Sequence, residues 1–522
     1  MASWTLPRPS SARLRAVSAL AAGAALAASF APLGLWPLAV LCPAALMWLW
    51  QDAPPREAAW LGFCFNAGTF TAGTYWLYIS IHGFGNAPIW LALFLMVGLA
   101  GIMALYHAAL GYACARWLPR TGAARWLVAL PAAWLLVEWW RGWFLSGFSW
   151  LSLGYSQTDT WLAGLAPVAG VYGVSAALLV SAGALTALVC GTRRVRLGAA
   201  VVLLLPWAAG AALRGVSWTH PVGAPVSVAI AQGAIPQDEK WLDDNRATTL
   251  NLYQKLTEQA LGTSLIVWPE SATAAVANEI VPYLTRVYRQ AHAHGSALVM
   301  GILRAEVGAS DPDAVRYYNS VLALDESASW YDKHHLVPFA EFFPVPQFVR
   351  SWMRLMSLPY SDFTPGAAVQ PPLAVAHLEL GTTICYEDAY GSAMLAVLGR
   401  ATALVNVTND AWFGHSSARH QHFQIARMRA LEEGRYLIRA ANDGISAVVG
   451  PHGEVLARAG EFRPEVLFSR VTPLAGLTPY ARVGNWLIVA LALLALAYGL
   501  AVRNDRLWRS RSGSAGAAPR GT

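Results

Sequence analysis

Residues 264–270 read SLIVWPE, a short apolar and β-branched run that Pro269 ends, leaving Glu270 just beyond it. Such runs are typical of buried strands, because Val and Ile pack well on a pleated surface and proline cannot continue the hydrogen-bonded ladder. Six further runs share this character, so we predict a sheet of mostly buried strands. They are VSVAIAQ (226–232), ALVMGIL (297–303), SVLALD (320–325), TTICYED (382–388), ALVNVTN (403–409) and ISAVVG (445–450).

Helical patterns lie between several of these runs, near 239–261, 276–294 and 420–438. Alternating strands and helices predict an α/β domain in which helices cover much of the sheet. Catalytic side chains in such domains tend to stand at strand ends, where a rigid frame holds them and the following loop gives access.

The rest of the chain is too apolar for a domain in water. The sequence is 56% hydrophobic and 13% charged, and apolar runs dominate from about Leu14 to Val216. Because about 20 apolar residues cross the roughly 30 Å of hydrocarbon in a bilayer, we predict a transmembrane domain of about seven helices over 1–216 and a last transmembrane helix over 485–503. The eight candidate spans lie near 16–33, 35–50, 58–80, 87–114, 126–144, 165–190, 197–213 and 485–502.

The arginines predict an orientation, since cytoplasmic loops are enriched in Lys and Arg. With the N-terminus in the cytoplasm, the Arg-rich loops fall on that side, Arg141 being an exception. Residues 217–484 are then extracytoplasmic, in the periplasm if the cell is Gram-negative, and 504–522 form a cytoplasmic basic tail. This topology explains the net charge of +7 without a nucleic-acid partner. The loop arginines are Arg56, Arg116, Arg120, Arg125, Arg193, Arg194, Arg196, Arg503, Arg506, Arg509 and Arg511.

Only one cysteine falls in the water-facing segment. Cys385 lies there, whereas Cys42, Cys64, Cys114 and Cys190 lie in or at the predicted spans. A lone thiol in an oxidising compartment is a chemical liability, because it is exposed to oxidation. The ordinary alternative is a buried small apolar side chain.

Three predicted strand ends carry chemically capable side chains. Glu270 follows Pro269, Lys333 lies in the polar cluster YDKHHLVP (331–338), and Cys385 lies in ICYED (384–388). Each of these residues alone is weak evidence for a catalytic site, because an exposed acid or lysine is usually a solvated surface charge. Their order and setting together are more specific.

In this order and setting the sequence resembles the nitrilase superfamily and, within it, the apolipoprotein N-acyltransferases, over nearly the whole chain. The resemblance implies a polytopic α-helical membrane domain joined to an α/β domain folded as an αββα sandwich, and an enzyme that adds the third acyl chain to bacterial lipoproteins. The matching strings are IPQDEKW (235–241), IVWPES (266–271), YDKHHLVPFAEFFP (331–344), ICYED (384–388), NVTNDAWFG (406–414), QHFQIARMRALEEGR (421–435) and LTPYARVGNW (477–486).

Residue roles follow from that resemblance. It implies Glu270 as general base, Lys333 as stabiliser of the transition state and Cys385 as nucleophile. Glu341, Glu387 and Tyr386 are expected to support the site, and Trp241, Asn409 and Trp412 are substrate-binding candidates. The expected partners are a phospholipid acyl donor, a diacylglyceryl apolipoprotein acceptor and the bilayer, with the enzyme acting as a monomer in the bacterial inner membrane. No nucleotide, metal or organic cofactor motif is found.

The residue types suit this chemistry. A thiol is mostly protonated at neutral pH, so a base that removes its proton and a cation that favours the thiolate raise its reactivity. Lys333, with a backbone N–H near Tyr386, can stabilise the oxyanion that forms when the thiolate attacks an ester. The resulting thioester then reacts with an amine in the same site, which gives ping-pong kinetics.

Other interpretations stay open at this stage. His334, His335, His415, His420 and His422 fit no standard zinc spacing. The stretch from Asn409 through Asp410 to Trp412 is either turn chemistry or part of a pocket. The aromatic and Met-rich segment 342–363 is either core or a mobile arm that dips into the membrane.

Two other functions also fit. One is a membrane-tethered amidase or nitrilase, in which water replaces the amine as acceptor. The other is a transporter whose soluble domain only binds ligand. The predicted spans argue against transport, since they contain few ionisable residues, Glu138 and Arg141 being the clearest, and no internal repeat.

Overall fold

The structure, a computed structural model, describes residues 8–308, 311–342 and 363–515. The chain divides into two compact units. It leaves the first between Val216 and Ser217 and returns to it between Arg482 and Val483, and the short segment Gly83–Asn86 groups with the second.

The first unit is helical. Among the described residues, four helices are long and apolar enough to span a membrane: Ile89–Trp117, Trp161–Cys190, Arg193–Leu213 and Trp486–Asn504. The α-helices of this unit are α1 (Ala12–Ala27), α2 (Leu38–Leu49), α3 (Pro55–Gly73), α4 (Trp76–Tyr78), α5 (Ile89–Trp117), α6 (Leu130–Arg141), α7 (Ala166–Cys190), α8 (Arg193–Leu213) and α15 (Trp486–Ala515).

Four of the eight expected spans, near 87–114, 165–190, 197–213 and 485–502, coincide with such a helix, and the other four are not confirmed. Helices α1 and α2 have 16 and 12 residues, and at 1.5 Å per residue they extend over about 18–24 Å, less than a bilayer core of roughly 30 Å. Helix α6 continues directly from a π-helix, Ala124–Ala129, and the joined segment contains Arg125, Glu138 and Arg141. Helix α3 is longer but contains Arg56, Glu57 and Asn66. Eight crossings stay a prediction.

The second unit contains two six-stranded sheets, of order β13-β2-β3-β4-β5-β6 and β12-β11-β10-β9-β8-β7. The neighbours β2, β3 and β4 run parallel, as do β8, β9 and β10. The strands are β1 (His220–Pro221), β2 (Val226–Gln232), β3 (Leu265–Trp268), β4 (Ala297–Gly308), β5 (Asp311–Leu324), β6 (Ala328–Asp332), β7 (Leu373–Val375), β8 (Leu378–Ile384), β9 (Ala403–Thr408), β10 (Leu437–Ala441), β11 (Ala447–Val449), β12 (Val455–Arg458), β13 (Glu465–Val471) and β14 (Leu474–Ala475).

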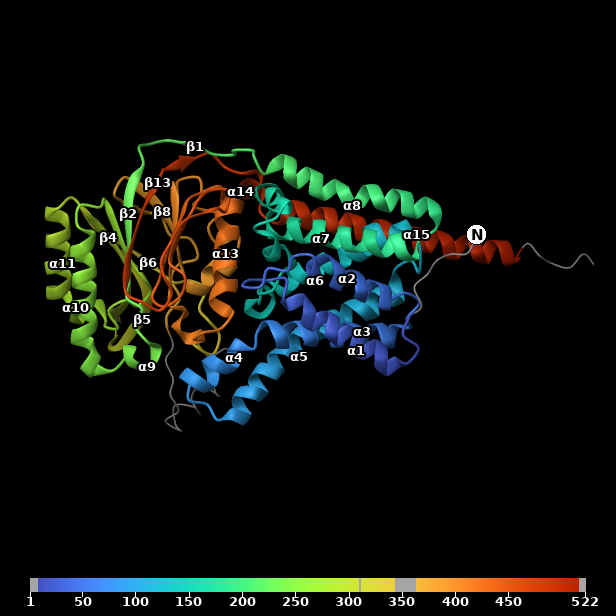
Figure 1. Ribbon diagram of the computed structural model, residues 1–522, viewed down its shortest axis with the longest axis horizontal. Coiled ribbons are helices and arrows are strands. Elements are labelled where there is room, and N and C mark those ends of the chain that lie inside the picture. Colours follow the sequence, from blue (N-terminus) through green and yellow to red (C-terminus); the bar gives the residue numbers. More distant parts are fainter. Residues whose placement is uncertain (1–7, 309–310, 343–362, 516–522) are drawn as a thin grey trace, which may run out of the picture. The chain divides into compact units, whose positions relative to one another are not determined.

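Helices cover the outer faces of both sheets. Figure 1 shows α10 and α11 beside the sheet of β2 and β4, and α13 on the opposite side of the unit. The unit is thus an αββα sandwich, as the family resemblance implies. Its α-helices are α9 (Gln237–Lys240), α10 (Asp243–Ala260), α11 (Val281–Ala293), α13 (Ala418–Glu433) and α14 (Pro479–Val483).

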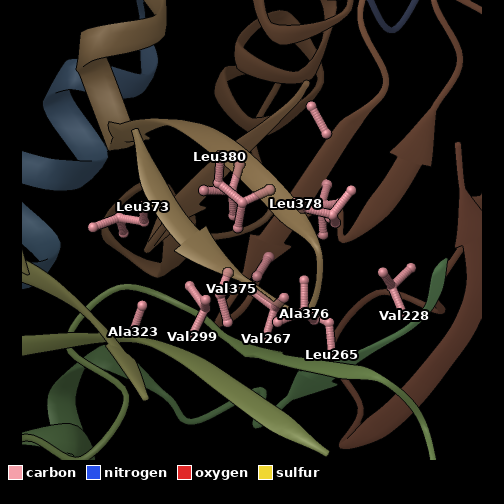
Figure 2. Close-up of a cluster of buried hydrophobic side chains, with 14 of the residues drawn as sticks. Val228, Leu265, Val267, Val299, Ala323, Leu373, Val375, Ala376, Leu378 and Leu380 are labelled. Atoms are coloured by element: carbon pink, nitrogen blue, oxygen red, sulfur yellow. The ribbon is translucent and has the colours of Figure 1, made fainter. Parts of the chain in front are cut away.

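Alternation of side chains along each strand decides which layer a residue joins. On β3, Leu265 and Val267 lie in the core between the two sheets, whereas Ile266 and Trp268 pack under α10 and α11. Figure 2 shows the core between the sheets, where Val267 and Val299 of one sheet face side chains such as Leu378 of the other. Burial on both faces explains why these strands are continuously apolar.

Several element boundaries differ from expectation. The helix predicted over 420–438 is wrong at its end, because α13 stops at Glu433, Gly434 adopts φ 61°, and the chain continues into strand β10. A left-handed glycine is a common helix terminator. The run at 382–388 is strand only to Ile384 and then becomes a 3-10 turn, Cys385–Ala389.

Candidate active site

Cys385 lies at a sharp elbow where β8 ends and the 3-10 turn Cys385–Ala389 begins. Its φ of 51° is in the left-handed region, which costs a non-glycine residue about 1–2 kcal/mol. Such strain persists only where surrounding contacts fix it, and it is frequent at functional sites. The elbow leaves Cys385 partly exposed while Ile384 before it is fully buried.

The Glu387 carboxylate holds this elbow to the loop that carries Lys333. One oxygen accepts the backbone N–H groups of His334 (2.8 Å) and His335 (3.0 Å), and the other accepts the Ile384 N–H (2.8 Å) and the Tyr331 hydroxyl (3.0 Å). Burial raises the pKa of Glu387, although these backbone donors favour its charged form. With four protein donors on the carboxylate, Glu387 is placed to position the elbow.

Glu270 and Lys333 meet in a buried cluster with Glu341 and Asn319. Lys333 Nζ lies 2.8 Å from Glu341 Oε1 and 3.7 Å from Glu270 Oε1. Asn319 Nδ2 donates to Glu270 Oε1 at 2.7 Å and to Glu341 Oε1 at 3.0 Å. The amide therefore holds the two carboxylates side by side, with one ammonium between them.

The charges of this cluster act on the thiol. Burial, and then the charge of Glu270, hold the pKa of Cys385 above its ordinary value, while Lys333 acts in the opposite direction. Burial disfavours the ammonium of Lys333, yet Glu341 and Glu270 together raise its pKa. Together these influences favour the protonated thiol over a preformed thiolate.

Two residues at this site were not singled out in the sequence analysis. Asn319 lies on β5, and its polar side chain within a strand pattern is the only local signal. Lys240 ends α9, is 1% exposed, and donates to the Glu270 carbonyl at 3.2 Å. Burial lowers the pKa of Lys240 to about 8, against the influence of Glu270. No local pattern shows that this lysine is buried.

A glycine on β4 lets the Glu270 backbone approach the sheet. A Cβ built on Gly301 would lie 2.5 Å from the Glu270 Cα, and the Gly301 carbonyl accepts the Ala272 N–H at 2.9 Å. Any larger residue at 301 would displace Glu270.

The substrate-binding candidates have different surroundings. Trp241 and Trp412 expose 47% and 40% of their surface. Asn409 is buried, donates to Gln237 Oε1 at 2.8 Å and accepts from Asn442 at 3.0 Å, so its side chain braces the turn. Tyr386, predicted to support the site, stacks edge-on against Tyr390, with ring centroids 5.4 Å apart.

The histidines are dispersed among separate contacts. His415 stacks on Phe462, and His420 lies 3.9 Å from Glu461. His422 is buried between two aspartates. Within the described ranges no three His, Cys, Asp or Glu side chains are grouped to hold a metal ion. The predicted arm, 342–363, lies outside the described residues except for its two ends.

Comparison with known proteins finds similarity over both units. Residues 22–184 match the apolipoprotein N-acyltransferase N-terminal domain, and residues 227–480 match the carbon-nitrogen hydrolase family. Apolipoprotein N-acyltransferase of Azotobacter vinelandii is 42% identical, with 92% of this chain and 94% of that protein covered. Those of Methylococcus capsulatus and Chromobacterium violaceum are each 40% identical; 91% and 95% of this chain and 93% and 94% of the relatives are covered.

Proposed function

Because the chain belongs to the apolipoprotein N-acyltransferase family, we propose that it moves a fatty acyl chain from a membrane phospholipid, through a thioester on Cys385, to the N-terminal amine of an S-diacylglyceryl-cysteine apolipoprotein. The observation that supports this mechanism is the elbow at Cys385, whose thiol interacts electrostatically with Glu270 and Lys333. The reaction completes lipoprotein maturation.

In the first half-reaction Cys385 Sγ attacks an ester carbonyl of the phospholipid while Glu270 takes the thiol proton. The new C–S bond forms a tetrahedral oxyanion, which Lys333 stabilises together with a backbone N–H near Tyr386. Preorganised donors of this kind each contribute about 10²–10³ in rate. The C–O bond then breaks, the leaving alkoxide receives the proton from Glu270, and lysophospholipid departs.

In the second half-reaction the amine of the apolipoprotein attacks the thioester. Glu270 takes a proton from the attacking nitrogen, the C–S bond breaks, and the thiolate of Cys385 is protonated again. An amide on the acceptor and the free enzyme result. The same three side chains serve both steps, which predicts ping-pong kinetics.

The apolar helices support a membrane location for this chemistry. We propose residues 1–216 and 485–503 as the transmembrane domain and 217–484 as a catalytic domain in the periplasm. Both termini then lie in the cytoplasm of a Gram-negative cell, with 504–522 as the basic tail. The Arg-rich loops support this orientation.

Thiol labelling of intact spheroplasts tests the orientation. Lys255→Cys, on the exposed face of α10, is expected to react with an impermeant maleimide before lysis, and Thr192→Cys, before α8, only after lysis. The unsubstituted protein measures labelling of its own five cysteines. Labelling at residue 255 only after lysis would overturn the orientation.

Hydrolysis and transport are the alternative functions. A hydrolase would use the same thioester and water, so only the fate of the acyl group separates it from a transferase. Transport draws little support from Glu138 and Arg141, because Glu138 accepts the Leu153 N–H and the Ser175 hydroxyl, and Arg141 donates to the Phe148 and Trp150 carbonyls. Both are held within the helical unit.

The acyl-enzyme is the test of the mechanism. Purified protein given phospholipid without acceptor is expected to gain the mass of one acyl chain, to release an equal amount of lysophospholipid, and to lose the added mass in hydroxylamine. Cys385→Ala should form no adduct and Glu270→Gln should form it very slowly, because the thiol then keeps its proton.

Adding a peptide with an S-diacylglyceryl cysteine and a free amine should discharge the adduct to the N-acylated peptide. Decay to free fatty acid at one rate with or without the peptide would support the hydrolase instead. An adduct on a residue other than Cys385 would refute the mechanism.

A further inference from the structure

Four charged side chains form a buried quartet behind the elbow: Asp388, Asp410, His422 and Arg439, each between 0 and 2% exposed. His422 Nδ1 lies 2.7 Å from Asp410 Oδ1, and its Nε2 lies 3.0 Å from Asp388 Oδ1. Arg439 lies 3.1 Å from the second oxygen of each aspartate. Each cation therefore bridges both carboxylates.

The geometry decides the protonation of His422. Carboxylates only accept hydrogen bonds, and both ring nitrogens face one, so both must carry a proton. With His422 as imidazolium, two carboxylates, one imidazolium and one guanidinium sum to zero charge. Neutrality matters because an uncompensated charge is costly to bury.

The quartet touches the backbone of the nucleophile. His422 Nε2 lies 3.2 Å from the Cys385 carbonyl oxygen as well as near Asp388. Asn406 Nδ2 lies 3.4 Å from the same carbonyl, and Asn406 Oδ1 accepts from Arg439 at 2.6 Å. The carbonyl of a residue held at φ 51° is thus fixed by donors that the quartet orients.

We propose that His422 is a positioning residue for Cys385: its imidazolium neutralises the buried quartet and holds the Cys385 carbonyl, so that the strained elbow presents the thiol. The inference rests on the proposed role of Cys385 as nucleophile. None of these four side chains is assigned a part in the bond-making steps. Their effect passes through the backbone of Cys385.

The proposal predicts a dependence on pH. The groups that face His422 are Asp388 and Cys385 from the 3-10 turn, Asp410 from the turn after β9, and Arg439 from β10. Burial opposes the imidazolium, but Asp388 and Asp410 raise the pKa of His422 to about 9. Because the folded pKa is raised, the contribution of the imidazolium is complete below the ordinary pKa of about 6.5 and is lost as pH rises through about 9.

Alkylation of Cys385 by iodoacetamide in the full-length, detergent-solubilised protein tests this without any acyl donor. Peptide mass spectrometry assigns the label to residue 385. The variants are His422→Gln, which leaves one uncompensated negative charge, and His422→Gln/Asp410→Asn, which restores neutrality. His420→Gln is the matched control, since His420 lies on the same helix but faces Glu461. Thermal melting of each variant shows that it is folded.

His422→Gln is expected to slow alkylation, and acylation by phosphatidylethanolamine in mixed micelles, by roughly 10²-fold at pH 7, as a misplacement of about 1 Å does. The double variant should regain at least tenfold, and the control should stay within about twofold. The ratio of wild-type to His422→Gln rates should fall toward one as pH rises through about 9.

An alkylation rate in His422→Gln equal to that of the wild type would overturn the proposal, as would a ratio that does not change with pH. A double variant as slow as the single one would overturn the part assigned to charge neutrality. If His422→Gln does not fold, the folded double variant is compared with the wild type instead. A double variant that is alkylated at the wild-type rate would then overturn the proposal. If alkylation follows the expected pattern but the wild type forms no acyl-enzyme, the proposed function is refuted and the positioning role of His422 still stands.

Discussion

Lys240→Met is expected to stabilise the protein at neutral pH while slowing its chemistry. Lys240 is 1% exposed, and its described contact is one hydrogen bond, to the Glu270 carbonyl. Burial lowers the pKa of Lys240 to about 8 from 10.5, although Glu270 opposes this. The folded protein therefore carries a charge that its surroundings disfavour.

The magnitude follows from the two pKa values. At about 1.4 kcal/mol for each pKa unit, a pKa of about 8 in place of 10.5 corresponds to about 3 kcal/mol of destabilisation at pH 7. Between pH 8 and 10.5 the unfolded chain binds the proton and the folded protein does not, so stability rises with pH in that window. The methionine removes this cost but also loses a charged hydrogen bond of about 1.5–3 kcal/mol, so the net gain at pH 7 is about 1 kcal/mol.

Thermal melts of the variant and the wild type in detergent measure the effect. Both are recorded at one scan rate, because irreversible unfolding makes the apparent melting temperature depend on scan rate. Lys240→Met should melt about 2–4 °C above the wild type at pH 7, and this advantage should disappear, and then reverse, as pH approaches 10. Lys255→Met, at an exposed site on α10, is the control, and it should change neither the melting temperature at pH 7 nor its dependence on pH. Acyl-enzyme formation should fall at least tenfold, because Lys240 fixes the Glu270 backbone.

A lower melting temperature for Lys240→Met at pH 7 would refute the reasoning, since the hydrogen bond would then outweigh the burial of the charge. So would a difference in melting temperature that stays constant between pH 7 and 10. Unchanged acylation would remove Lys240 from the active site and leave only the stability argument.

Glu341→Gln should slow acyl-enzyme formation by about 10²–10³, the loss of one oxyanion donor, because Lys333 then turns to Glu270 as its remaining carboxylate. Glu341→Asp should recover part of the rate, and equal rates in all three proteins would contradict this. Gly301→Ala should lower acylation at least tenfold and the melting temperature by several degrees, because its Cβ would lie 2.5 Å from the Glu270 Cα. Gly399→Ala, whose Cβ meets nothing within 4 Å, should change neither, and a Gly301→Ala variant with wild-type acylation would show that the site absorbs the displacement.

Much of the second unit was predictable from short stretches. The run 226–232 coincides with β2, and period-2 alternation on β3 decides which side chains enter the core between the sheets. The helices of the first unit were predictable as apolar segments, but their lengths were not, because helix ends depend on caps and on contacts with neighbouring helices.

The end of α13 shows where local pattern is ambiguous. The apolar residues after Gly434 continue a helical period on paper, yet they form strand β10 because β9 offers them a parallel ladder. A backbone partner some 30 residues away in sequence outweighs a local preference.

By itself the sequence determined the order of the chemical residues: Glu270, Lys333 and Cys385 each follow a strand, and strand ends are readable from proline and from the change of apolar to polar residues. Tertiary structure alone decided what surrounds them. Asn319 between two carboxylates and the buried Lys240 depend on contacts far apart in sequence. So does the neutral quartet, in which Arg439 reaches Asp388 51 residues away. Burial and charge pairing are sums over the whole fold, so no local stretch of the chain contains them.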